Sequence, residues 1–357
     1  MKSQTLHQPP AIAAGKTPVA RRAPASIGSL VRRPEMGSLI GLVCVYAFFW
    51  IFGGANFVSI GGLASWLNVA AELGIVALPV GLLMIAGHLD ISIGSVIPAS
   101  SMTIAIVSGH YGAPIIVGIL AALALGLVVG LINGLLVIRT AVPSLIVTLA
   151  TLFAVAGLTL GLSVILTGST SVAIDGGAVA KVLLGDFVGG KFEVTIFWWI
   201  AAVAIAGFIL HFSRYGNWIL ALGGDKESAR NAGIPTDRVT MVLFLSSGLG
   251  AAFLGLSQAL LYNSAQVSAG QSFIFNSIIA VVIGGVLLTG GYGSVVGIVL
   301  GTVTFAIVNQ GIFYTGFDAN WASLIIGVLL FAAVLMNNTF RGMALSYMPR
   351  KTGRIRS

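Results

Sequence analysis

Apolar residues run through this chain in blocks of about twenty, separated by short polar or glycine-rich stretches. Since a helix of roughly 20 apolar residues crosses the hydrocarbon core of a bilayer, each block has the length of a membrane span. The blocks within 66–108 and within 272–315 are only a few residues apart, so eight or nine spans are the alternatives to ten. The ten predicted spans are 38–58, 66–86, 91–108, 113–137, 143–167, 194–211, 239–262, 272–290, 293–315 and 320–337.

The composition agrees with this pattern. Of the 357 residues, 57% are hydrophobic and only 8% are charged, and the mean hydropathy is +1.04. These values exclude an ordinary soluble domain and predict an all-α polytopic membrane protein. The single cysteine, Cys44, lies within the first apolar block, so no internal disulfide can form. The sequence predicts no metal site and no cofactor.

Positive charge is distributed unevenly about the predicted spans. With ten spans and the N-terminus inside, sixteen of the 18 Lys and Arg residues fall on the cytoplasmic side, and only Lys181 and Lys191 fall outside. This is the positive-inside distribution, and it predicts cytoplasmic termini. We expect a disordered tail over 1–36, a permease domain over 37–340 and a basic tail over 341–357. The net charge of +8 then indicates attraction to anionic membrane lipid, not to nucleic acid.

Several spans carry repeated small residues, in two of them at every fourth position. Because lipid gives helices no hydrophobic reason to associate, such positions favour close packing of two backbones. The glycines concerned are Gly126, Gly130 and Gly134, then Gly248, Gly250 and Gly255, and finally Gly293, Gly297 and Gly301.

One strongly charged segment, 211–238, interrupts the apolar blocks. Within it, Asp225 is placed as the N-cap of a short helix over 226–231. Gly224 lets the chain turn into that helix and Gly233 ends it. Physical chemistry alone leaves two interpretations of this segment, an ordinary solvated connection and a surface that binds a partner.

A second motif, Gly-His-Leu-Asp-Ile-Ser-Ile-Gly-Ser at 87–95, falls at the tight turn between the second and third spans. An acidic residue near the membrane is costly, roughly 2.5–3.5 kcal/mol at the centre of a helix. Asp90 is therefore expected to be capped, hydrated or functional. The spacing predicts that its side chain caps the third span by accepting from the backbone N–H of Ile93.

These two motifs carry a family resemblance. Leu-Gly-Gly-Asp-Lys-Glu-Ser-Ala-Arg-Asn-Ala-Gly-Ile, at 222–234, resembles the cytoplasmic coupling loop of permease subunits in ribose-type carbohydrate ATP-binding-cassette importers. Asp225 stands where Asn is usual there, and Ser228 where Ala is usual. The turn at 87–95 is similar to the signature Gly-Gly-Ile-Asp-Leu-Ser-Val-Gly-Ser of the same family, with His88 replacing the second glycine. The residues carried over are Gly223, Gly224, Asp225, Glu227, Ser228, Ala229, Arg230 and Gly233 for coupling, and Gly87, His88, Asp90, Ser92 and Gly94 for the turn.

The resemblance implies a ten-helix permease whose helices 2–5 and 7–10 form an inverted repeat. It also implies a bacterial inner-membrane location and three protein partners: an ATPase subunit, an extracytoplasmic sugar-binding protein and a second permease copy, identical or different. The chain has no credible ATP-binding motif, so it is not expected to be an enzyme. Import of a small sugar is the favoured function. Import of an amino acid or a signalling molecule by the same architecture is the alternative, and a self-sufficient secondary transporter is a more distant one.

Polar residues within the predicted spans are candidates for the translocation pathway: Glu72, Asn133, Gln258, Asn276 and Asn309. Each of the amides can equally be a buried hydrogen bond between helices. A buried carboxylate needs a partner, and the sequence does not identify one for Glu72.

Overall fold

The computed structural model describes residues 35–140 and 142–316, with 318, 324, 327, 328, 331 and 335. In this part of the chain, eight helices are long and apolar enough to cross a membrane. The polytopic all-α class is thereby confirmed. The two predicted tails fall almost entirely outside the described residues, and so does most of the predicted span 320–337. The inverted repeat stays a prediction.

The long helices are α2 (Glu35–Val58), α3 (Ile60–Ile85), α4 (Ile93–Ile104), α5 (Ile115–Arg139), α6 (Ser144–Thr167), α8 (Thr195–Phe212), α11 (Thr236–Tyr262) and α13 (Val295–Gly311). A π-helical turn, Ala105–His110, extends α4, and a 3-10 turn, Ile312–Tyr314, extends α13. Helix α12 (Gln271–Ile283) has only 13 residues.

The predicted span 272–290 is therefore wrong in its second half. After Ile283 the chain enters a turn in which Gly285, Gly290 and Gly291 have positive φ values of 86°, 81° and 75°. Glycine adopts this left-handed conformation without the penalty that a side chain brings, so these glycines end the helix. Gly293 also belongs to this turn and not to a helix.

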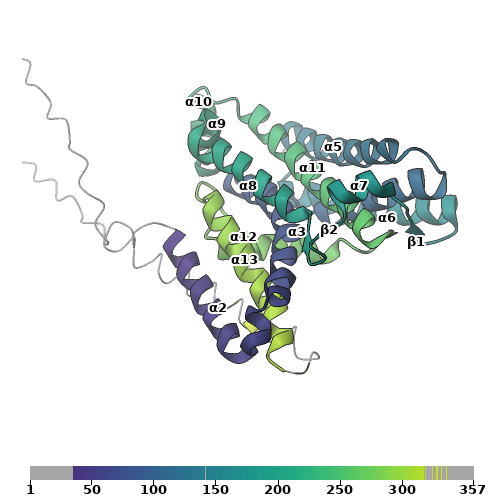
Figure 1. Ribbon diagram of the computed structural model, residues 1–357. Helices are drawn as coiled ribbons and strands as arrows, with labels where there is room; N and C mark the ends of the chain where they lie inside the picture. Colours follow the sequence, from purple (N-terminus) through teal and green to yellow (C-terminus); the bar gives the residue numbers. More distant parts are fainter. Residues whose placement is uncertain are drawn as a thin grey trace, which may run out of the picture.

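Helix α3 lies at the centre of the bundle. Of its most apolar 18-residue stretch, 78% is buried, against 17% for α6. Helices α11, α12, α13 and α8 pack around α3, whereas α5 and α6 lie on one side and α2 on the other (Figure 1). The peripheral helices expose large apolar side chains, as lipid-facing helices do.

The predicted glycine packing is confirmed in three places. A Cβ on Gly126 of α5 would meet the backbone of Gly248 on α11, and one on Gly301 of α13 would meet the backbone of α12 at Ala280. Gly255 of α11 lies equally close to α4. At these crossings the helices are in backbone contact, because any larger residue would separate them.

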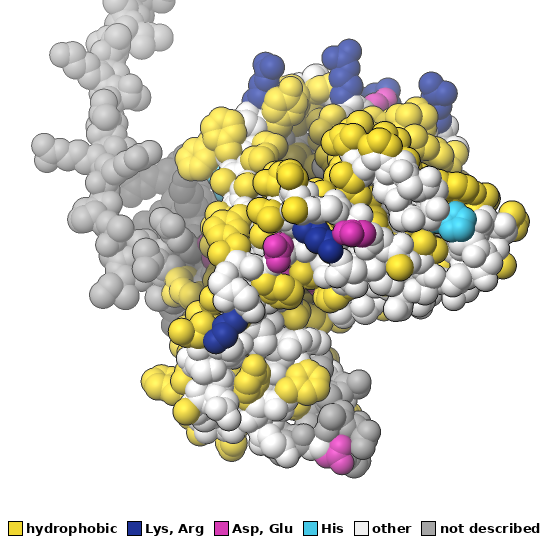
Figure 2. All heavy atoms as spheres, turned by 45° about the vertical axis from the view of Figure 1, so that its right-hand side comes forward, with side chains coloured by type: hydrophobic (Ala, Val, Ile, Leu, Met, Phe, Trp, Pro, Cys, Tyr) yellow, Lys and Arg dark blue, Asp and Glu magenta, His cyan; other side chains and the backbone are white. Residues whose placement is uncertain are grey.

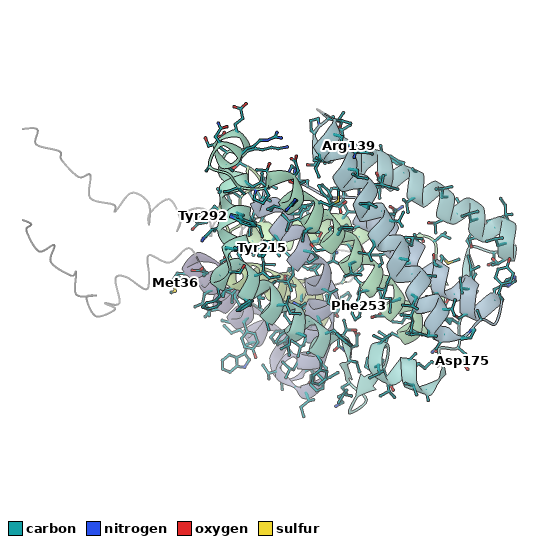
Figure 3. The ribbon with its side chains drawn as sticks, turned by 90° about the horizontal axis from the view of Figure 1, so that it is seen from above. Met36, Arg139, Asp175, Tyr215, Phe253 and Tyr292 are labelled. Carbon is teal, nitrogen blue, oxygen red and sulfur yellow. The ribbon has the colours of Figure 1, made fainter. Side chains whose placement is uncertain are left out.

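The two ends of the bundle carry different elements (Figure 1). At one end lie α9 (Arg214–Gly224) and α10 (Lys226–Asn231); we call it the α10 end. At the other, the β1 end, β1 (Ser171–Ala173) pairs antiparallel with β4 (Ser264–Gln266). Helix α7 (Gly177–Leu184) and the hairpin of β2 (Phe187–Val188) and β3 (Phe192–Glu193) follow β1 in the chain. Figure 3 shows Arg139, the last residue of α5, far from Asp175, which precedes α7.

Candidate functional site

The predicted short helix in the charged segment is α10, and its cap is confirmed. Asp225 is extended, with φ −159°, and its Oδ1 accepts from the N–H of Ser228 at 2.7 Å. Hydrogen bonding from Ser228 lowers the pKa of Asp225, so the carboxylate that caps α10 is ionised at neutral pH. Gly233 has φ +82° and its N–H donates to the carbonyl of Arg230 at 3.0 Å, which ends the helix as predicted.

Most side chains of α10 are exposed. Glu227 and Arg230 point away from the bundle, and Ala229 is buried beneath them. Arg230 Nη2 lies 3.9 Å from the carboxylate of Asp237 at the start of α11. Lys and Arg side chains stand along this edge of the molecule (Figure 2). The α10 end therefore presents an exposed, mainly basic surface.

A cluster of glycines joins α9 to the bundle; we call Gly87, Gly223, Gly290 and Gly291 the glycine junction. A Cβ on Gly223 would overlap the carbonyl oxygen of Ile85, the last residue of α3. The N–H of Gly291 donates to that same carbonyl at 2.8 Å. The Cα of Gly87 would lie 2.8 Å from a Cβ on Gly290. Helix α9 thus meets the bundle through backbone atoms.

Gly224 was expected to let the chain turn into α10, but its backbone conformation does not require glycine. Its φ is not positive, and a Cβ there would meet nothing within 4 Å. The position that tolerates no side chain is its neighbour Gly223, because that residue faces the end of α3.

The carboxylate of Asp90 is buried, with the residue only 2% exposed. Its Oδ1 accepts from the N–H and the Oγ of Ser92, at 3.0 and 2.6 Å, and its Oδ2 accepts from Ser247 Oγ at 2.7 Å. The predicted cap on the N–H of Ile93 is therefore wrong. Burial raises the pKa of Asp90, and the hydrogen bonds from Ser92 and Ser247 oppose that effect. The third span is tied to α11 through this residue.

Hydrogen bonds extend from Asp90 to two further helices. Asn133 Nδ2 of α5 donates to Ser92 Oγ at 2.9 Å, and Thr151 Oγ1 of α6 donates to Asn133 Oδ1 at 2.7 Å. We call Asp90, Ser92, Asn133, Thr151 and Ser247 the Asp90 network. Asn133 is therefore not part of the polar pocket described below, since both ends of its amide are engaged between helices.

The two other turn residues lie between elements. His88 Nε2 lies 3.4 Å from Thr240 Oγ1 of α11, and the His88 ring packs against Phe244 with centroids 5.9 Å apart. Burial, and then the charge of Lys226 on α10, lower the pKa of His88 to about 4. Gly94 faces the side chain of Ile274 on α12.

A polar pocket of about 260 Å³ lies between α3, α12 and α13. It brings together Glu72, Asn276 and Asn309, three of the predicted pathway residues. Gln258 of α11 donates to Glu72 Oε2 at 3.2 Å, which identifies the partner that the sequence did not. The remaining lining residues are Ser272, Val69, Leu73, Phe273 and Phe305.

Sequence reasoning missed Glu193, at the end of β3. The residue is 6% exposed, and its Oε2 has no hydrogen-bond partner in the part of the chain that the structure describes. Burial raises its pKa to about 7. Among the described residues, no Lys, Arg or His nitrogen lies within 4.0 Å of Glu72 or Glu193. The signal in the sequence was an acidic residue directly before an apolar block.

Of the residues that the structure describes, no three His, Cys, Asp or Glu side chains form a group that could hold a metal ion. The site is thus a neutral to acidic pocket within the helices, together with a basic surface at one end.

Residues 62–334 match the family model described as "Branched-chain amino acid transport system / permease component". This protein is therefore a transport permease of that family, a membrane component rather than an enzyme.

Individual relatives are similar over most of their length. The chain is 30% identical to the ribose import permease protein RbsC of Escherichia coli (strain K12) over 284 residues. This alignment covers 77% of the chain and 85% of RbsC. It is 31% identical over 290 residues to the xylose/arabinose import permease protein XylH of Sulfolobus acidocaldarius, and this alignment covers 78% of the chain and 77% of XylH. The autoinducer 2 import system permease protein LsrD of Photorhabdus laumondii is 29% identical over 238 residues, which make up 67% of the chain and 71% of LsrD.

The depressed pKa of His88 predicts how stability depends on pH. Between pH 4 and 6.5 the folded protein binds fewer protons at this ring than the unfolded chain, so its contribution to stability is lost as the pH falls through that window. We expect the melting temperature of the detergent-solubilised protein to drop on acidification more steeply than that of His88→Gln. Parallel pH curves for the two proteins would show that the ring titrates normally.

Proposed function

We propose that this protein is the membrane-spanning subunit of an ATP-driven importer that carries a small sugar, a monosaccharide, into the cytoplasm. Its membership of a transport permease family supports this, and so does its similarity to import permeases named for ribose and for xylose and arabinose. The observation that carries the proposal is the joining of α10, an exposed and capped surface helix, to the ends of the pocket-lining helices through the glycine junction.

The partners follow from the two ends of the bundle. The ATPase subunit binds the α10 end, where Glu227 and Arg230 are exposed. A sugar-binding protein delivers its ligand to the β1 end, and a second permease copy, identical or not, completes the membrane unit. The positive-inside distribution of Lys and Arg supports an inner-membrane orientation with the α10 end and both termini in the cytoplasm.

The pocket favours a neutral polyhydroxylated solute over an amino acid. Carboxylate and amide side chains can accept from and donate to hydroxyl groups, and Phe273 and Phe305 offer apolar surface for the carbon skeleton. An amino acid carries a carboxylate as well as an ammonium group, and its carboxylate needs a cation or several N–H donors. No Lys or Arg lines the pocket among the described residues. The family description supports the amino acid alternative, and a signalling molecule such as autoinducer 2 is a further one.

Coupling is proposed to pass through the glycine junction. Three helices line the pocket, and each of them ends at or next to the junction: α3 at Ile85, and α12 and α13 at the turn that holds Gly290 and Gly291. When the ATPase moves α10, α9 moves with it, and the contact of Gly223 with Ile85 transmits that displacement to the pocket.

Reconstitution tests the function. Purified permease in proteoliposomes, combined with its ATPase and binding protein, should accumulate ribose or another monosaccharide only when ATP is supplied. The permease alone should neither hydrolyse ATP nor take up sugar. Accumulation by the isolated chain under an ion gradient would instead identify a secondary transporter, for which Glu72 offers an intramembrane carboxylate.

Neighbouring glycines test coupling in a matched pair. Gly223→Ala places a methyl group against the Ile85 carbonyl, whereas Gly224→Ala meets nothing within 4 Å. We expect Gly223→Ala to retain membrane insertion but to lose most ATP-dependent uptake, and Gly224→Ala to transport normally. Uptake and substrate-stimulated ATP hydrolysis are measured at equal membrane levels. Equal transport by both variants would show that the junction does not transmit the movement.

Glu72 tests the pocket. Glu72→Gln replaces a carboxyl group that can bond a solute hydroxyl with an amide, and one such hydrogen bond contributes about 0.5–1.5 kcal/mol. We therefore expect the KM for uptake to rise roughly two- to tenfold. Thr159→Val on α6, where the hydroxyl donates to the Val155 carbonyl of its own helix and does not line the pocket, is the control and should leave KM unchanged. An unchanged KM in Glu72→Gln would place the solute elsewhere.

A further inference from the structure

Helix α7 is apolar on nearly all sides. Its sequence is Gly-Ala-Val-Ala-Lys-Val-Leu-Leu, so Lys181 is its only charged residue. One face is covered: Ala180 is 6% exposed and packs in a cluster with Leu260 of α11. The opposite face is not covered, because Val179, Val182 and Leu183 are 76%, 59% and 54% exposed. We call these three residues the α7 stripe. A helix that is apolar all round is normally covered on every side.

The α7 stripe continues into surface that faces lipid. Trp198, in the first turn of α8, donates from Nε1 to the carbonyl of Leu183 at 2.8 Å, which fixes the end of α7 beside α8. Helix α8 is a membrane span, and its neighbouring side chains Phe197 and Ile200 are 57% and 58% exposed. A span face that no other helix covers is in contact with lipid, so the stripe, which continues this face of α8, borders on the bilayer.

The depth of α7 is indicated by the polar groups around it. Tryptophan is enriched where the bilayer meets water, and Trp198 lies in the first turn of the span α8, near its end. Lys181 forms an ion pair with Asp175 at 3.5 Å, and the Asp175 side chain is 90% exposed. The hydrogen bond from Gly177 and the charge of Lys181 lower the pKa of Asp175, which keeps it ionised. Figure 2 shows acidic and basic side chains next to apolar ones on the face in view. An ionised flank beside an apolar stripe is typical of a helix lying in the membrane interface.

We propose that α7 lies in the lipid interface at the β1 end, with Val179, Val182 and Leu183 inserted among the acyl chains just below the headgroups. In the orientation proposed above this is the outer leaflet. The occupant of the stripe is lipid and not a protein that comes and goes, since departure of such a protein would expose three large apolar side chains to water. The inference does not depend on which solute is transported.

Single-cysteine labelling tests this placement. Cys44 is the only cysteine and is exposed, so Cys44→Ala provides a background without reactive thiols. Val182→Cys, in the stripe, and Asp186→Cys, exposed two residues beyond α7, are each labelled with an environment-sensitive fluorophore. The full-length permease is then placed in lipid nanodiscs without other proteins. Quenching is measured with lipids that carry a nitroxide high on the acyl chain, and separately with aqueous iodide.

We expect the Val182 label to be quenched several-fold more strongly by the nitroxide lipid than the Asp186 label, and to be protected from iodide. The Asp186 label should show the reverse pattern. Strong iodide quenching at Val182 would place the stripe in water and overturn the proposal. Protection from both quenchers would also overturn it and indicate a second permease copy, which cross-linking through Val182→Cys would detect. Iodide access that disappears only when the binding protein is added would make the stripe a docking surface instead.

Serine at the stripe provides a second readout that does not require labelling. Val179→Ser with Val182→Ser keeps the buried face of α7 intact, so the protein should fold and show the same elution profile. Its melting temperature in nanodiscs should fall towards the value that it has in detergent. An unchanged difference between nanodisc and detergent would count against lipid contact at this face.

Discussion

Helices inside a bilayer gain nothing by hiding apolar surface from one another, so their association here depends on how closely two backbones approach. Gly126 on α5 meets Gly248 on α11, and Gly301 on α13 meets α12, in each case where a Cβ would collide with backbone. The contact of Gly223 with Ile85 is of the same kind, although it joins a surface helix to the bundle. The interaction that builds the membrane domain is thus also the one that attaches α9, the helix through which coupling is proposed to pass.

Buried polar groups divide into two kinds by the number of their partners. The carboxylate of Asp90 accepts three hydrogen bonds, from the backbone and hydroxyl of Ser92 and from Ser247, so its desolvation is compensated. Glu72 accepts one hydrogen bond, from Gln258, and otherwise faces the pocket. Compensation of this sort marks Asp90 as a residue that holds helices together. Incomplete compensation marks Glu72 as one that has acceptor capacity left for a solute.

The sequence was informative wherever the determining interaction is local. The cap of Asp225 on Ser228 and the left-handed Gly233 depend on residues within one short segment, and both were predicted. Membrane spans are also local, since each follows from one apolar run. Long-range partners could not be predicted: Ser247 is 157 residues from Asp90, and Gln258 is 186 residues from Glu72. The end of α12 was misplaced because hydropathy continues past Ile283, while glycine backbone conformation ends the helix there.

Transmission from the glycine junction to the pocket requires that α3 be stiff. Glu72 and Ile85 lie on this one helix, 13 residues and therefore about 20 Å apart.

Pro79 stands between them, and a proline usually kinks a helix because it removes one backbone hydrogen bond. Yet α3 is continuous from Ile60 to Ile85. Gly250 of α11 packs directly against this point, where a Cβ would lie 3.0 Å from the Pro79 ring and 3.2 Å from the Ile75 carbonyl. Neighbouring helices can compensate a proline in this way within a membrane. In the proposed coupling, support from α11 at this point keeps α3 rigid, so that a displacement at Ile85 would reach Glu72 instead of being absorbed at Pro79.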